Sequence, residues 1–185
     1  AKKAKTQHFG RLRRGALVNL ATCQLRAGTP ELAAKAAQQA ASESREAADW
    51  SVHGMAQSVH ADALRQLGQL EGAREAIDEA IEVKRRARDP NMAIALLRRA
   101  DILREAGLDD AAVADGQLAW EHARQTGNDD QIARARLWLA LTASDGADQD
   151  ALASLATLVA ELGKAERSLR GPTRKLLETA RRRLD

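Results

Sequence analysis

The sequence predicts an all-α fold in which antiparallel helix hairpins stack in a right-handed superhelix (an α-solenoid) and a C-terminal helix caps the stack. Apolar residues recur at the helical spacing of three to four along the chain. Gly28, Gly68 and Gly107 follow one another at intervals of 40 and 39 residues, and glycine ends helices easily. Small residues recur with the same period where helices must pack closely: Ala21, Ala61 and Ala100; Ala33, Ala73 and Ala112; Ala40, Ala80 and Ala119. Because such hairpins are stable only against their neighbours, we expect a mostly helical chain without a sheet.

Four hairpin units and a cap are expected within one domain of residues 1–185. The units span residues 6–47, 49–88, 89–127 and 129–163, and the cap spans 172–184. Asp49, Asp89 and Asp129 are expected to cap the first helices of units two to four, because an N-cap oxygen accepts a free backbone N–H. Thr29 is the expected cap before the second helix of unit one. The first helix, residues 6–27, is expected to turn these residues inward: Leu12, Ala16, Leu17, Leu20 and Ala21.

The C-terminal part differs from the first three units. Its turn, residues 144–148, is the longest loop expected, and Gly163 is expected to end a leucine-rich helix. The dipeptide Gly171-Pro172 opens the last helix, since proline is favoured in the first turn. Leucines and an alanine are expected on its inner side and arginines on its outer side: Leu176, Leu177, Ala180 and Leu184; Arg181, Arg182 and Arg183. A terminal helix with a polar outer face covers the last apolar surface of a stack.

The repeat resembles the tetratricopeptide repeat (TPR) family. Its signature places a small residue in the first helix, a glycine near the turn and small residues early and late in the second helix, as in Ala61, Gly68, Ala73 and Ala80. The period of 39–40 residues exceeds the common 34. It is similar to the longer repeats in sensor regions of bacterial regulators and in motor-protein light chains. The resemblance implies a scaffold or regulatory module that binds a protein or peptide in a concave groove.

Composition and charge exclude several other classes. The chain is 44% hydrophobic and 30% charged, and its net charge of +3 indicates a mixed surface, not a polyanion-binding one. Cys23 is the only cysteine, which fits a reducing cytoplasm, and we expect it to be partly buried. No apolar run approaches the roughly 18 residues that a membrane span needs. We expect no nucleic-acid binding through residues 84–88 and 181–183, because basic residues in a last helical turn complement the helix dipole.

The sequence carries no sign of catalysis. No phosphate-binding loop, nucleophile elbow or metal-ligand spacing is present, so we expect no enzyme activity, cofactor or metal. His53, His60 and Asp49 could share a helix face, but a metal site needs further ligands, and surface histidines are the preferred interpretation. Trp50, Trp120 and Trp138 are expected to fill gaps between alanine-faced helices.

The resemblance also places the candidate binding residues in the first helix of each unit. They are Val18, Thr22 and Leu25 in unit one; Met55, Ser58, Asp62 and Arg65 in unit two; and Ile94, Leu97, Asp101 and Arg104 in unit three. The family's Lys/Asn clamp for a terminal carboxylate is missing, because Val18 and Thr22 stand where it would begin.

One feature of these positions repeats between units two and three. Each aspartate is followed three residues later by an arginine, which could pair with it locally. We expect both pairs to contact polar groups of a partner, with Met55, Ile94 and Leu97 as apolar anchors, and the groove to suit an amphipathic helix or mixed-charge peptide. Solvent-exposed pairs without function are nearly as consistent with the pattern. Self-assembly through the ends of the stack and a nucleic-acid-associated regulator are the alternatives.

Overall fold

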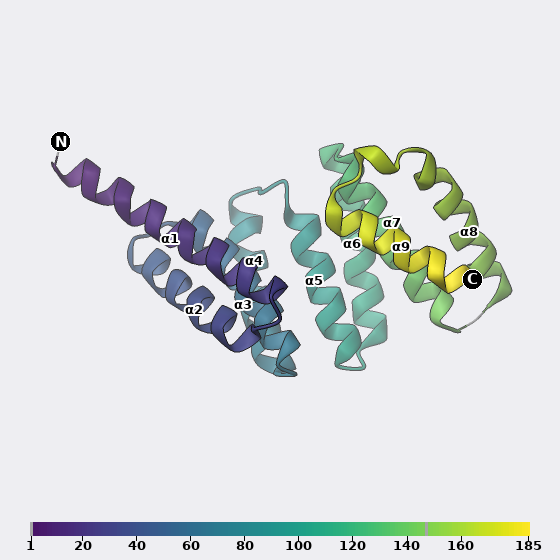
Figure 1. The fold of residues 1–185 in the computed structure, drawn as a ribbon, viewed down its shortest axis with the longest axis horizontal. Helices are drawn as coiled ribbons and strands as arrows, with labels where there is room; N and C mark the ends of the chain where they lie inside the picture. Colours follow the sequence, from purple (N-terminus) through teal and green to yellow (C-terminus); the bar gives the residue numbers. More distant parts are fainter. Residues whose placement is uncertain (1, 147) are drawn as a thin grey trace.

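The described part of the chain, residues 2–146 and 148–185 of a computed structural model, contains nine α-helices and no strand (Figure 1). The helices are α1 Lys2–Arg26, α2 Pro30–Glu46, α3 Trp50–Gln66, α4 Leu70–Arg86, α5 Met92–Glu105, α6 Asp109–Thr126, α7 Asp129–Ala143, α8 Gln149–Lys164 and α9 Gly171–Leu184. Two short 3₁₀ turns, Ser144–Gly146 and Glu166–Ser168, precede α8 and α9. The structure is 86% helical, which confirms the predicted all-α class.

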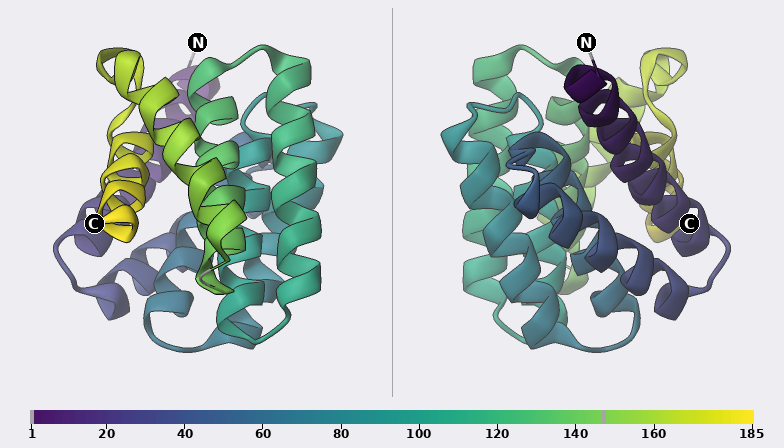
Figure 2. Two further views of the ribbon diagram at one scale, coloured as in Figure 1. Left: turned by 90° about the vertical axis from the view of Figure 1, so that its right-hand side faces the viewer. Right: turned by 90° about the vertical axis from the view of Figure 1, so that its left-hand side faces the viewer.

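Consecutive helices pack as antiparallel hairpins that stack along the long axis of the molecule. Each helix from α1 to α7 packs against the next, and α1 also contacts α3, as α5 contacts α7. The termini of the chain lie toward opposite ends of the stack, with α1 at one end and α8 and α9 at the other (Figure 1; Figure 2). This arrangement is the predicted helical-hairpin α-solenoid.

Left-handed residues end most of the helices. Gly28, Gly68, Gly107 and Gly127 have φ between 65° and 74°, a conformation that costs other residues about 1 kcal/mol or more. The predicted glycine turns are therefore confirmed. Ala48 (φ 52°) and Arg88 (φ 49°) adopt the same conformation after α2 and α4 without a glycine.

The N-caps follow the prediction only in unit two. Asp49 caps α3 and accepts a hydrogen bond from the Val52 backbone N–H at 3.5 Å. Before α7 the prediction is wrong by one residue, because Asn128 is the cap and accepts from the Gln131 N–H at 3.1 Å. Asp129 instead lies in the first turn, where its charge complements the helix dipole.

The other two predicted caps are also corrected. Helix α5 begins only at Met92, with Asn91 as its N-cap, and Asp89 accepts hydrogen bonds from the Asn91 N–H at 2.8 Å and from Lys84 Nζ at 2.6 Å. Thr29 occupies the N-cap of α2, but its hydroxyl donates to a backbone carbonyl of α1 and caps nothing. At the far end, α8 continues through Gly163 to Lys164.

The core changes character along the stack. In units one and two it is built largely from alanines, such as Ala37, Ala40 and Ala61, all fully buried. Around α7, α8 and α9 it is built from leucines, such as Leu137 and Leu155. Each buried methylene contributes about 0.8 kcal/mol, so the leucine-rich part gains more per residue from burial.

The three tryptophans have different environments. Trp138 is 5% exposed and Trp120 packs partly buried against the core, as predicted. Trp50 is 51% exposed, so its prediction as a gap-filling residue is wrong. Trp138 fits because Gly116 makes room: a Cβ there would lie 2.6 Å from Trp138 Cζ3.

The two ends of the stack are covered unequally. Helix α9 buries Leu177, Ala180 and Thr173 against α7 and α8, as expected of a cap, although Leu184 is 37% exposed. Helix α1 turns Val18 and Ala21 inward, whereas three side chains expected there are exposed: Leu12, Ala16 and Leu20. The prediction failed because α1 carries apolar residues on both faces, so their spacing alone does not identify the inner one.

Candidate functional site

A hollow of about 500 Å³ lies where α3, the end of α4 and α5 meet. We call it the α3–α5 groove. Trp50 and Met55 of α3 line it, both substantially exposed, together with the half-buried Ile94 of α5. The remaining lining residues are Ser51, Gly54, Val83, Lys84, Ala87, Asp89, Asn91, Ala95 and Arg98. The groove therefore offers apolar side chains within a polar rim, which is the usual composition of a binding site.

The groove exists because the connection between α4 and α5 is long. It spans residues 87–91, whereas the other connections between α1 and α7 span 27–29, 47–49, 67–69, 106–108 and 127–128. Arg88 is left-handed, which ends α4, and Asp89 accepts a hydrogen bond from the Asn91 backbone N–H at 2.8 Å before α5 begins at Met92. The two extra residues separate the helices and leave the apolar surface of Trp50 uncovered.

Trp50 also borders a second hollow of about 480 Å³. Val83 and Ala87 line both hollows, and Glu79, Glu82 and Arg86 complete the second one. The indole ring stands edge-on to the His53 ring, with centroids 5.8 Å apart and planes at 89°. A half-exposed aromatic ring that contacts a neighbouring ring and lines two hollows can contact an apolar partner group.

The charges at the rim of the groove are paired within the protein. Lys84 Nζ lies 2.6 Å from Asp89 Oδ2, and Arg98 Nε lies 3.1 Å from Asp62 Oδ2. Burial works against the charged Asp89, but hydrogen bonds from Lys84 and Asn91 lower its pKa below the usual value. Burial raises the pKa of Asp62 above its usual value, although Arg98 and Arg65 oppose this.

Arg134 of α7 differs from these cations. It is partly buried, and within the described residues no ion pair joins it to a carboxylate within 4.0 Å. Burial and the nearby Arg98 lower its pKa from the usual value, while Asp101 and Asp62 act in the opposite direction. Arg134 is therefore a cation near the groove residue Arg98 that lacks a carboxylate ion pair among the described residues.

Two of the predicted binding residues, Met55 and Ile94, come together in the groove. Three others are corrected, because they are buried: Val18 (7% exposed), Ser58 (1%) and Leu97 (2%). Leu97 therefore cannot serve as an anchor, and the Ser58 hydroxyl donates to the Gly54 carbonyl at 2.9 Å. In unit one, Thr22 donates to the Val18 carbonyl and Leu25 packs on the core, so neither is brought to the groove.

The predicted Asp–Arg pairs join neighbouring units instead of forming locally. Asp62 pairs with Arg98, and Arg65 pairs with Glu105, both of α5. Asp101 accepts a hydrogen bond from Trp138 Nε1 at 2.7 Å. Arg104 lies 3.0 Å from Asp145, which follows α7. These side chains recur because they connect one unit to the next, so reversing the charge at Asp62 and Asp101 would disturb stability as well as any binding.

Sequence reasoning missed Trp50 and Val83 as groove residues. A shift of 40 residues pairs Trp50 with Pro90, so Trp50 stands outside the repeated core positions. That departure from the repeat is the signal that could have identified it.

The predictions for His53 and Cys23 are also corrected. His53 is buried, not on the surface: Nδ1 lies 2.9 Å from the Ala41 carbonyl oxygen and Nε2 lies 2.9 Å from Glu79 Oε1. Cys23 is exposed, not partly buried. Among the described residues, no group of three or more His, Cys, Asp or Glu side chains could hold a metal ion. In that same part of the chain, no helix has the length and apolarity to span a membrane.

The two basic clusters are paired internally. Lys84 is buried beside Asp89, while Arg85 and Arg86 both contact Glu82 at 2.6 and 2.7 Å. In α9, Arg181 pairs with Glu166 and Arg183 with Asp145. Arg88 and Arg182 are exposed and belong to none of the ion pairs among the described residues, so the pairing covers most of each cluster but not all of it.

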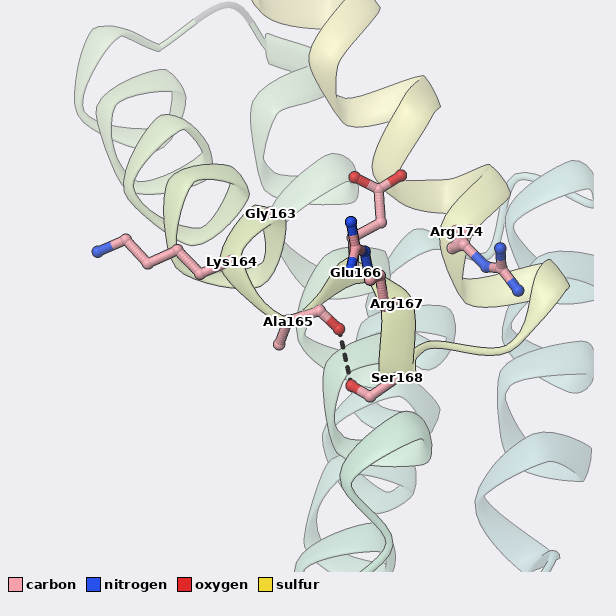
Figure 3. Close-up of a pocket in the computed structure, with 7 residues that line it drawn as sticks. All are labelled: Gly163, Lys164, Ala165, Glu166, Arg167, Ser168 and Arg174. Carbon is pink, nitrogen blue, oxygen red and sulfur yellow. Dashed lines mark hydrogen bonds between the residues drawn. The ribbon is translucent and has the colours of Figure 1, made fainter.

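Another hollow, of about 720 Å³, lies in the connection between α8 and α9 (Figure 3). Charged and small side chains line it: Gly163, Lys164, Ala165, Glu166, Arg167, Ser168 and Arg174. The Ser168 hydroxyl donates to the Ala165 carbonyl at 2.7 Å, and Lys164 points away from the other side chains. It offers no large apolar anchor, so the α3–α5 groove is the better candidate site.

The stacked hairpins, the left-handed glycine turns and the small residues between helices define the chain as a TPR-like helical-repeat protein in fold. Two solved structures of kinesin light chain TPR-like repeats from Podosopora anserina, one a single-substitution variant, match it with a TM-score of 0.68. The matches cover 94% and 95% of this chain and 87% of theirs, at 19% sequence identity, so the likeness is one of fold. No protein-family model and no curated protein matches the sequence.

Proposed function

We propose that the chain is a non-catalytic interaction module that binds an amphipathic helix or a mixed-charge peptide in the α3–α5 groove. The observation that carries the proposal is the exposed apolar surface of Trp50 and Met55 beside Ile94, in a hollow of about 500 Å³. Tryptophan is among the residues that contribute most to binding at interfaces. A scaffold or regulatory role in the cytoplasm belongs to the same proposal.

The charges near the groove indicate which polar group accompanies the apolar anchor. Lys84 and Arg98 at the rim already have carboxylate partners, whereas Arg134 has none within the described residues. A peptide that places an apolar side chain against Trp50 and an acidic side chain toward Arg98 and its neighbour Arg134 would complement both. The TPR-like fold supports the proposal, since proteins of this fold are typically interaction modules without catalysis.

The test is a selection of peptides from a random 16-residue display library on the whole chain. Selected peptides are then titrated against the double variant Trp50→Ala/Met55→Ala. We expect at least a tenfold loss of affinity, which corresponds to about 1.4 kcal/mol. Because both side chains are exposed, the variant should keep the circular dichroism spectrum of the parent.

Leu118→Ala is the matched control, because Leu118 is 50% exposed on α6 and does not line the groove. It should bind the peptides as the parent does. Peptides that bind the double variant with parental affinity would show that the groove is not the binding site.

A further inference from the structure

The outer face of α1 carries an apolar stripe that this chain leaves uncovered. Leu12 is 57% exposed and Leu20 is 49% exposed, and Ala16 and Cys23 are exposed on the same side. These residues are three or four positions apart, so they are neighbours along one face of the helix. In the view from this end of the stack, α1 lies at the front (Figure 2, right).

Three of the four stripe positions are buried one repeat later, and the fourth, Leu20, corresponds to the half-buried His60. A shift of 40 residues, the one that relates Gly28 to Gly68, pairs stripe residues with residues of α3. The pairs are Leu12 with Val52, Ala16 with Ala56, and Cys23 with Ala63. The three α3 residues are 4%, 0% and 0% exposed, in the core cluster that includes the alanines of α2. The stripe on α1 therefore corresponds to the surface of α3 that packs against the preceding unit.

Helix α1 is built like an internal helix of the stack. Its opposite face buries Val18 and Ala21, so α1 carries apolar residues on two sides, as a helix between two neighbours does. Helix α9 ends the other side of the stack with exposed polar residues, including Arg174, Lys175 and Glu178. Among the described residues, α9 therefore has the polar outer face of a cap, whereas α1 exposes the leucines of the stripe beside its arginines.

Charge favours an acidic occupant for the stripe. Residues 1–26 contain seven lysines and arginines and no aspartate or glutamate. Arg13 pairs with Glu43, and Arg11 and Arg14 pair with Asp49. Arg26 is exposed, and none of the ion pairs among the described residues involves it. A second copy of α1 would bring the same positive charge to the interface, and like charges oppose association. A helix with acidic flanks would be attracted.

The small residues in the stripe favour a helix over a lipid surface. Ala16 and Cys23 lie between the larger leucines, and a Cβ added at the neighbouring Gly15 would meet nothing within 4 Å. Small side chains let another helix approach closely and interlock with the leucines. The buried contact of Ala56 and Ala63 with the preceding unit shows this packing inside the stack.

We propose that the outer face of α1 is a second interaction surface, separate from the α3–α5 groove, that receives an acidic amphipathic helix of a partner protein. The partner helix packs its apolar stripe on Leu12, Ala16 and Leu20, as the first unit packs on α3. Its acidic flanks face the positive charge of α1. This proposal holds whether or not the groove binds a peptide.

The test uses a display library of single helices with a fixed Leu/Ala stripe and randomised flanking positions, selected on the whole chain. We expect selected helices to be enriched in Asp and Glu at the flanks and to lose at least tenfold in affinity for the variant Leu12→Gln/Leu20→Gln. Both leucines are exposed, so the variant should melt at the parental temperature. Leu118→Gln and the groove variant Trp50→Ala/Met55→Ala are controls that should bind as the parent does.

Four outcomes would overturn the proposal. These are selected helices with neutral or basic flanks, no selected helix at all, binding that survives the double leucine variant, and binding lost in the groove variant. Two further measurements exclude the other occupants. Dimerisation at micromolar concentration that is lost in the leucine variant would show that a second copy of the chain occupies the stripe. Binding to phosphatidylcholine/phosphatidylglycerol vesicles through the same leucines would show that a membrane surface occupies it. We expect a monomer that does not sediment with vesicles.

Discussion

Helices α3 and α5 meet at an open groove, whereas α5 and α7 meet at a closed contact, and each place contains one tryptophan. At the open place Trp50 is 51% exposed, edge-on to His53. At the closed place Trp138 is 5% exposed, packs over Gly116 and donates to Asp101. The difference shows that the local fit decides whether a large side chain stabilises the stack or remains available to a partner. Gly116 makes room for one ring, and the long connection at residues 87–91 leaves the other uncovered.

The largest difference in stability between the two places should appear when each tryptophan is replaced by alanine. Trp138→Ala removes a buried ring and the partner of Asp101, so we expect a loss of about 3–5 kcal/mol in the free energy of unfolding. Trp50→Ala should cost less than about 1 kcal/mol, because half of the side chain is exposed. Urea unfolding followed by circular dichroism measures both. Equal losses for the two variants would mean that the two environments do not differ as described.

A smaller loss of stability is expected when Gly116, which leaves space for the Trp138 ring, is replaced by alanine. In Gly116→Ala the new Cβ would lie 2.6 Å from Trp138 Cζ3 and 2.9 Å from Leu139 Cδ2, so the ring must shift. Overpacking of this kind costs about 1–3 kcal/mol, more than the helix propensity of alanine returns. Gly72→Ala is the matched control on α4, since its Cβ would meet only a flexible leucine at 3.4 Å. A melting temperature for Gly116→Ala at or above that of Gly72→Ala would contradict the account.

The smallest expected effect on stability concerns Glu79, which contacts the His53 ring beside Trp50. His53, which the ring contacts, lies against Glu79, and Glu79 also accepts hydrogen bonds from Arg45 and Gln57. Burial works against the charged carboxylate, but His53 and Arg45 lower the pKa of Glu79 below its usual value. The group therefore adds stability above the usual glutamate range, and this stability is lost as the pH falls through the lowered pKa.

Melting temperatures between pH 6 and pH 3 test this effect. The parent should lose stability more steeply below about pH 4.5 than the variant Glu79→Gln, which has no carboxylate to protonate. Parallel curves for the two proteins would show that Glu79 does not contribute to the pH dependence.

The sequence predicts the stack well because the repeat depends on local properties. Glycines at the left-handed turns and alanines at close contacts are dictated by backbone sterics, and both recur in the sequence at the repeat period. Ala48 and Arg88 were missed as turn residues because neither has the residue type that favours φ above zero. Without Arg88 as a turn residue, the connection between α4 and α5 was predicted two residues too short, so α5 was predicted to begin too early.

The candidate site was predicted only in part. Met55 and Ile94 were identified because repeat positions on the first helices face one side. Asp62 and Asp101 were assigned to a partner although they contact the next unit, because spacing within a helix does not reveal the neighbouring helix. Trp50 was missed because composition alone cannot tell a ring that fills a gap from one that borders a groove.

Fluorine NMR of the chain labelled with 5-fluorotryptophan tests the groove as the binding site. The three resonances are assigned with single Trp→Phe variants, and a peptide selected on the parent is then added. We predict that the Trp50 resonance shifts on binding and becomes less sensitive to the H₂O/D₂O exchange of solvent, while the Trp138 resonance keeps its position. A saturating peptide that leaves the Trp50 resonance unchanged would contradict the account.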